Sequence, residues 1–195
     1  MTETKEPGAY PDVAVPAPTP HATEEQVEAA RHDTKLAQVL YHDWEAESYD
    51  EKWSISYDQR CIDYARGRFD AIVPDEVQRE LPYDRALELG CGTGFFLLNL
   101  IQAGGVARRG SVTDLSPGMV KVATRNGLSL GLDIDGRVAD AEGIPYEDNT
   151  FDLVVGHAVL HHIPPTWSCR CARWCGCSSR VAGSSSRASP PPSAT

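Results

Sequence analysis

The sequence lacks long apolar runs and any targeting pattern at its start. No stretch of its 195 residues approaches the roughly 18 apolar residues that a membrane-spanning helix needs. Its first six residues, MTETKE, also lack the basic region and apolar run of a secretory signal. We therefore expect a cytoplasmic protein that makes no membrane contact.

Basic residues are scarce relative to acidic ones. The chain has 18 Lys and Arg against 28 Asp and Glu, a formal net charge of -10. Such a field does not favour attraction to nucleic-acid phosphates or to anionic lipids. The apolar fraction of 41% and the charged fraction of 24% are ordinary for a globular protein. These values favour one catalytic domain and no binding of nucleic acid, and they leave the oligomeric state open.

Cysteine is sparse outside one short segment. Cys61 and Cys91 lie far apart, and the other four crowd together at Cys169, Cys171, Cys175 and Cys177. This distribution is unlike a secreted disulfide framework. The paired cysteines are separated by one residue, whereas zinc sites usually have gaps of about two to four residues within a pair. We therefore expect no metal site, with a zinc module kept as the weaker alternative.

Composition divides the chain into four segments. Residues 1–22 are rich in Pro and Ala and predict a disordered leader, because they hold too little apolar bulk to offset the entropy of ordering. Residues 23–84 predict a helical cover, residues 85–164 a strand-and-helix core, and residues 165–195 a disordered tail without acidic residues. The folded part should begin with a helix capped by Thr23 that runs towards Leu40.

The predicted cover is rich in aromatic residues set among charges. It carries Trp44, Tyr49, Trp53, Tyr57, Tyr64 and Phe69. Amphipathic helices could turn these rings onto an active site, or the rings could be ordinary core, since buried aromatics dominate core energetics. Both interpretations stay open. Tyr49 and Trp53 are the residues that we expect to line a substrate site.

Strands and helices alternate in the predicted core. Apolar strands are expected at Ala86–Leu89, Gly110–Thr113, Ile134–Ala139 and Phe151–Val155, with helices from Phe95 to Ala103 and from Pro117 to about Asn126–Gly127. This alternation predicts an α/β fold, a Rossmann-like, doubly wound parallel sheet with helices on both faces. About four strands are visible, so the sheet is expected to be incomplete.

A glycine-rich turn follows the first predicted strand. Gly90, Gly92 and Gly94 alternate with Cys91 and Thr93 where the strand becomes a helix. Glycine lets backbone approach a ligand closely and adopt unusual dihedral angles. Asp114 ends the next strand, some twenty residues downstream, where a carboxylate can accept hydrogen bonds from a ribose diol. The pair predicts an adenosine site.

Four motifs in this order resemble class I S-adenosylmethionine-dependent methyltransferases, in particular the small-molecule branch that includes ubiquinone and menaquinone biosynthetic enzymes. The strings are LELGCGTG, VTDLSPGM, VADAEGIPYEDNTFDLVV and FDLVVGHAVLHHIP, and the resemblance covers roughly Tyr41 to Pro164. It implies S-adenosyl-L-methionine as cofactor, methyl transfer to an unidentified small molecule, and cofactor contacts at Tyr49, Glu88, Gly90, Cys91, Gly92, Gly94, Asp114, Leu115, Met119, Asp140, Ala141 and His157.

The resemblance also implies particular roles. Glu88, the glycines and His157 would lie near the methionine part of the cofactor, and Asp114 would hold the ribose hydroxyls, with Leu115 and Met119 nearby. Asp140 would contact the adenine amino group, and Ala141 would contribute a backbone amide. No catalytic residue is assigned.

Other interpretations of the same residues remain. A nicotinamide-binding domain also has glycines and an acidic residue, but usually in the pattern G-x-G-x-x-G. Glu88 could be a simple strand-end carboxylate and Asp140 a turn former. His161 and His162 suggest a metal pair, yet neighbouring residues point in different directions. His161 as a catalytic base is the other alternative.

The tail departs from the pattern of the resembled family, which continues with a helix and three more strands. With GC-rich codons chosen freely, the residues from Thr166 onward can be rewritten in a neighbouring frame as a peptide with the pattern of a helix, a Pro-Gly-Gly turn and a strand, so we hypothesise a truncation or frameshift. The strand Phe151–Val155 would then be an exposed edge prone to aggregation. The alternative function is accordingly a noncatalytic remnant that binds the cofactor weakly or not at all.

Overall fold

The computed structural model describes residues 22–103, 105–159 and 181–184. The predictions for the leader, for His161 and His162 and for the four clustered cysteines fall outside these residues. Within residues 22–103 and 105–159, no helix is both long and apolar enough to cross a membrane.

The amino-terminal part is helical, as its composition predicts. Helix α1 (Glu24–Ala30) begins with a reciprocal capping box between Thr23 and Gln26, and α2 (Thr34–Glu45) is capped by the side chain of Asp33. The single helix expected from Thr23 to Leu40 is wrong, because the chain breaks between α1 and α2 to let Asp33 start a new helix. Three further helices follow, α3 (Tyr49–Lys52), α4 (Gln59–Ile72) and α5 (Asp75–Gln78).

The sheet is parallel and has the order β3-β2-β1-β4-β5. The four expected strands are confirmed, with bounds β1 (Tyr83–Leu89), β2 (Ala107–Asp114), β3 (Ile134–Val138) and β4 (Leu153–His157). A fifth strand, β5 (Val181–Ser184), pairs with β4 inside the segment where we expected no strand. The expectation that the fourth strand is an open edge is therefore wrong.

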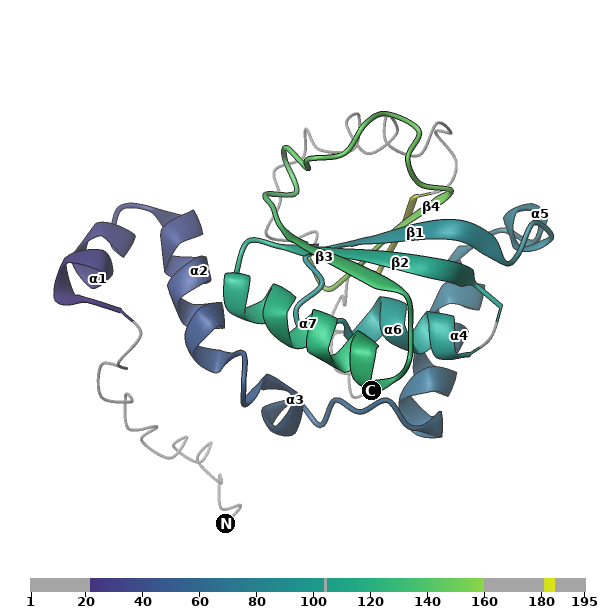
Figure 1. The fold of residues 1–195 in the computed structure, drawn as a ribbon, viewed down its shortest axis with the longest axis horizontal. Helices are drawn as coiled ribbons and strands as arrows, with labels where there is room; N and C mark the ends of the chain where they lie inside the picture. Colours follow the sequence, from purple (N-terminus) through teal and green to yellow (C-terminus); the bar gives the residue numbers. More distant parts are fainter. Residues whose placement is uncertain (1–21, 104, 160–180, 185–195) are drawn as a thin grey trace, which may run out of the picture.

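The two faces of the sheet are covered differently (Figure 1). Helices α4, α6 (Phe95–Gln102) and α7 (Pro117–Ser129) lie on one face, where Phe69, Leu97 and Val112 belong to the main core. On the other face Leu87 and Leu89 of β1 pack against Ile144 and Phe151, which belong to the loop before β4. Because side chains alternate along a strand, β1 contributes to both cores. In the described part of the chain, a loop and not a helix covers the second face.

Glycines allow the helices to pack closely onto the sheet. A side chain at Gly110 of β2 would meet Ile134 at 2.7 Å and Ile101 at 2.9 Å, and one at Gly127 of α7 would meet Ile134 at 2.7 Å. Gly127 was expected to end its helix. Instead α7 continues to Ser129, and Gly131, with φ of +70°, adopts the left-handed conformation after it. Gly127 thus serves packing and not capping.

We expect Gly110→Val to lower the free energy of unfolding by about 1–3 kcal/mol, because the added methyl groups would overpack the contact between β2 and α6. The control is Gly67→Ala in the interior of α4, where a side chain would meet nothing within 4 Å. That change should raise the free energy of unfolding by about 0.5–1 kcal/mol. Urea unfolding followed by circular dichroism measures both, and a Gly110→Val protein as stable as the original would contradict the tight packing.

Candidate functional site

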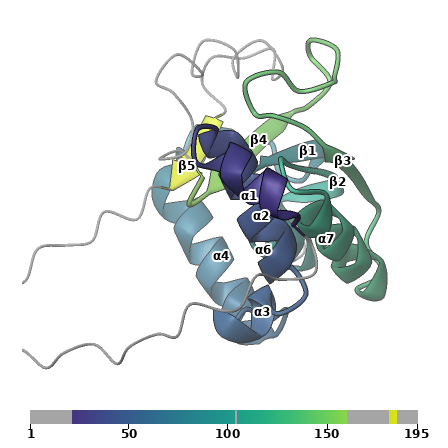
Figure 2. The ribbon, with the colours of Figure 1, turned by 90° about the vertical axis from the view of Figure 1, so that its left-hand side faces the viewer.

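A pocket of about 650 Å³ opens where the carboxyl ends of β1, β2 and β4 meet the amino-terminal helices. This volume is typical of sites for small molecules and cofactors. Figure 2 views this end of the molecule and shows α1 and α2 in front of the strands. Every predicted cofactor residue except Gly94 lines the pocket: Tyr49, Glu88, Gly90, Cys91, Gly92, Asp114, Leu115, Met119, Asp140, Ala141 and His157.

The glycine-rich turn forms part of the pocket wall. Gly90, Gly92 and Gly94 have φ values of +56°, +52° and +88°, in the left-handed region that side chains disfavour. A side chain on Gly92 would meet no atom within 4 Å, so the turn presents bare backbone to open space. Gly94 instead caps α6, and a side chain there would meet Leu98 at 2.8 Å. Gly94 therefore shapes the turn without lining the pocket.

A polar cluster fixes the back of this turn. The hydroxyl of Tyr57 donates a hydrogen bond to the carbonyl of Thr93 at 2.9 Å. The amide of Asn126 donates to that carbonyl at 3.2 Å, to the Tyr57 oxygen at 2.9 Å and to Asp50 at 3.1 Å. Burial raises the pKa of the Tyr57 phenol well above its ordinary value. The cluster joins α3 and α7 to the turn and holds the turn in position.

The carboxylate of Asp114 joins β2 to the glycine-rich turn. One oxygen accepts a hydrogen bond from the backbone of Gly92 at 2.9 Å, and the other accepts one from the backbone of Ser116 at 2.9 Å. Burial raises the pKa of Asp114, while the two backbone hydrogen bonds act in the opposite direction. A carboxylate has about four acceptor positions, so Asp114 can still accept from a ligand in the pocket.

Glu88 lies at the bottom of the pocket and is almost completely buried, with 1% of its surface exposed. One of its oxygens accepts a hydrogen bond from the backbone of Leu97 at 3.0 Å. Burial and, to a smaller extent, the nearby charge of Asp114 raise the pKa of Glu88 to about 8. A carboxyl group with this pKa is mostly protonated at pH 7.

Asp140 is paired with a lysine that sequence reasoning missed. Lys35 of α2 contacts Asp140 at 2.5 Å and Glu142 at 2.9 Å, and all three residues line the pocket. Burial raises the pKa of Asp140, but the hydrogen bonds from Lys35 and from the backbone of Glu142 outweigh it, so the pKa is lowered overall. Asp140 is thus an ionised acceptor at the rim.

Helix α2 is fastened to the start of α7 beside the pocket. Asp43 accepts hydrogen bonds from the Ser116 hydroxyl and from the backbone of Gly118, the latter at 2.8 Å. Ser116 itself caps α7 through the backbone of Met119. This attachment brings His42, the neighbour of Asp43, into the pocket wall.

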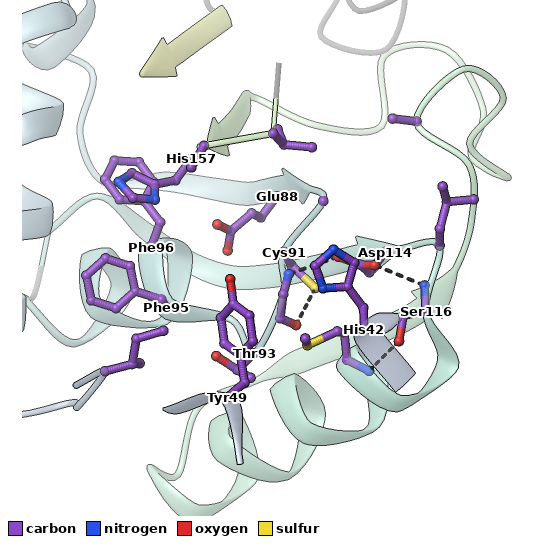
Figure 3. A pocket seen from close by; sticks show the side chains of 18 of the residues that line it. His42, Tyr49, Glu88, Cys91, Thr93, Phe95, Phe96, Asp114, Ser116 and His157 are labelled. Carbon is purple, nitrogen blue, oxygen red and sulfur yellow. Dashed lines mark hydrogen bonds between the residues drawn. The ribbon is translucent and has the colours of Figure 1, made fainter. Parts of the chain in front are cut away.

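Aromatic rings form the wall at the end of β4 (Figure 3). The ring of His157 stacks on Phe96 with centroids 5.1 Å apart and meets Phe95 edge-on at 5.6 Å. The hydroxyl of Tyr64 lies 3.4 Å from Nε2 of His157. Burial lowers the pKa of His157, and the charge of Arg68 lowers it further. The imidazole is therefore neutral near pH 7.

The aromatic residues of the cover divide between the two roles left open by the sequence. Phe69 is completely buried in the main core. Tyr49, Trp53 and Tyr64 line the pocket, and Trp53 is 57% exposed.

We expect Glu88→Gln to change how stability depends on pH. Between about pH 4.5, the ordinary pKa of Glu, and pH 8 the folded protein holds a proton that the unfolded chain has lost, so stability must fall as the pH rises across this window. The substitution removes that contribution. Urea unfolding at pH 5 and pH 8.5 should show that the free energy of unfolding of the variant increases relative to that of the original protein as the pH rises. A constant difference between the two proteins would contradict the raised pKa.

No group of three or more His, Cys, Asp or Glu residues that could hold a metal ion occurs in residues 22–103 and 105–159. The two cysteines of this part, Cys61 and Cys91, are free and buried, and burial raises the pKa of the Cys91 thiol well above its ordinary value.

Residues 86–175 match the family model of a methyltransferase domain. A 27-O-demethylrifamycin SV methyltransferase of Amycolatopsis mediterranei is 36% identical over 88 residues, 43% of this chain and 31% of that protein. A ubiquinone biosynthesis O-methyltransferase of Xanthomonas oryzae pv. oryzae is 33% identical over 115 residues, 57% of this chain and 43% of that protein. The chain thus spans less than half the length of these relatives.

A solved structure from Methanococcus maripaludis, described as an S-adenosylmethionine-dependent methyltransferase, shares the fold. Its TM-score is 0.52 at 19% identity, with 68% of this chain and 58% of that chain covered. At this identity the likeness establishes the fold alone.

Proposed function

We propose that this chain, whose residues 86–175 match a methyltransferase domain, is a class I S-adenosylmethionine-dependent methyltransferase that transfers a methyl group from that cofactor to a small molecule. The observation that carries the proposal is the junction of Gly92 and Asp114 at the pocket, where bare backbone meets a half-buried carboxylate. This combination suits a ribose, whose two hydroxyls need an acceptor and space beside the main chain.

The residues of the pocket fit the parts of such a cofactor. We propose that Asp114 holds the ribose hydroxyls, that Asp140 and Ala141 contact adenine, and that Glu88 lies towards the methionine part. A sulfonium carries a positive charge, and a cation near Glu88 would favour the ionised carboxylate. Asp140 would then share its oxygens between Lys35 and the adenine amino group.

The cofactor supplies an activated methyl group, and what remains for the protein is alignment of the acceptor. We propose that the acceptor lies against the aromatic wall of Tyr64, Phe95, Phe96 and His157, with Tyr49 and Trp53 at its border. These rings present flat apolar faces, and His157 is neutral near pH 7 and able to accept a proton. A planar, largely apolar acceptor fits this wall.

The test of the proposal is the affinity of S-adenosylhomocysteine for Asp114→Asn. The substitution keeps the size of the side chain but removes its charge and one acceptor, so binding should weaken about tenfold to a hundredfold, as for the loss of hydrogen bonds to a charged group. Isothermal titration calorimetry at pH 7.5 measures it.

The matched control is Asp84→Asn, because Asp84 is an exposed carboxylate paired with Arg109 outside the pocket. Its affinity for the ligand should equal that of the original protein. If the folded original protein does not bind S-adenosylhomocysteine or S-adenosylmethionine, or if Asp114→Asn binds as well as the control, the proposed function is wrong.

A further inference from the structure

The imidazole of His42 is a polar group in the pocket wall that the predicted cofactor set leaves out. Its Nδ1 is buried and has no hydrogen-bond partner among the described residues. Buried polar atoms are nearly always paired in folded proteins, so the unpaired Nδ1 is an exception in a ring that lines the pocket. The contacts of the ring with the protein are edge-on packing against Tyr41, with centroids 5.2 Å apart, and Tyr49, at 6.4 Å.

The backbone holds His42 in place independently of any ligand. Its neighbour Asp43 binds the first turn of α7 through Ser116 and Gly118. A side chain at Gly118 would lie 3.0 Å from the Asp43 carboxylate, so only glycine lets α2 approach this closely. His42 is therefore presented to the pocket by a fixed helix and not by a loop.

The ring lies close to Asp114. Figure 3 shows the ring in front of the carboxylate of Asp114, and the electrostatic interaction with His42 acts against the burial that raises the pKa of Asp114. Both oxygens of Asp114 already accept backbone hydrogen bonds and retain acceptor capacity on the side towards the pocket. His42 and Asp114 thus line the same pocket from α2 and β2.

A ribose diol needs this combination. Each hydroxyl donates one hydrogen bond and keeps lone pairs that can accept another. We propose that His42 is a ribose-binding residue, whose imidazole N–H donates to a hydroxyl oxygen of the cofactor while Asp114 accepts the hydroxyl protons. This inference rests on the proposed function, because the ribose belongs to the cofactor. With His42 in this role, helix α2 takes a direct part in cofactor recognition.

The experiment compares three ligands on variants of His42. S-adenosylhomocysteine and its 2′-deoxy and 3′-deoxy forms are titrated by calorimetry into the original protein, His42→Phe and His42→Gln. Phe keeps the ring packing without a donor, and Gln restores an N–H donor. The matched control is His32→Phe, because His32 is exposed and does not line the pocket. Thermal unfolding of each protein verifies that it is folded.

We expect His42→Phe to bind S-adenosylhomocysteine about three- to tenfold more weakly, the usual effect of one lost hydrogen bond. His42→Gln should recover part of the affinity, and His32→Phe should behave as the original. With the deoxy ligand that lacks the contacted hydroxyl, His42→Phe and the original protein should bind with similar affinity. Such coupling between one side chain and one hydroxyl would not follow from a packing role.

Two outcomes overturn this inference and leave the proposed function unaffected. One is a His42→Phe protein that binds S-adenosylhomocysteine as tightly as the original, and the other is an equal loss with all three ligands. If His42→Phe does not fold, the comparison of His42→Gln with His42→Ala on the same ligands decides by the same criteria. If the folded original protein binds none of the ligands, the proposed function fails, and the inference fails with it.

Discussion

The hydrogen bond from the backbone of Gly92 to the carboxylate of Asp114 is the contact on which the pocket depends. It joins the turn after β1 to the end of β2, two neighbouring parallel strands whose carboxyl ends meet at one edge of the sheet. The bond joins the left-handed backbone of the turn to a half-buried carboxylate. The side chains and helices around the pocket are arranged about this junction.

The amino-terminal helices complete the pocket through two attachments of α2. Near its start, Lys35 bridges Asp140 and Glu142, and near its end Asp43 binds the first turn of α7. The exposed ion pairs contribute little stability each, since surface salt bridges are usually worth less than about 1 kcal/mol. The attachment at Asp43 is more buried and fixes the helix, whereas the lysine bridge can exchange with a ligand at the rim. Cofactor recognition and the docking of α2 are thereby connected.

The sequence predicts well the strand ends and the residues that they bring to the pocket, and the cover poorly. Gly92 and Asp114 follow predicted strands directly, so the adjacency of parallel strands brings them together. Lys35 and His42 lie on a helix whose position over the sheet depends on the contact of Asp43 with Gly118, and no local pattern encodes that contact. Gly127 was mistaken for a helix end because its packing against Ile134 is a tertiary effect, and β5 lacks the alternation of a strand.

The most direct test of this account is a crystal structure of the protein with S-adenosylhomocysteine. The account predicts the ribose hydroxyl oxygens at about 2.5–3.0 Å from the carboxylate of Asp114, with the ligand against the backbone of Gly92. A ligand bound elsewhere on the molecule, or one whose ribose faces away from Asp114, would contradict it.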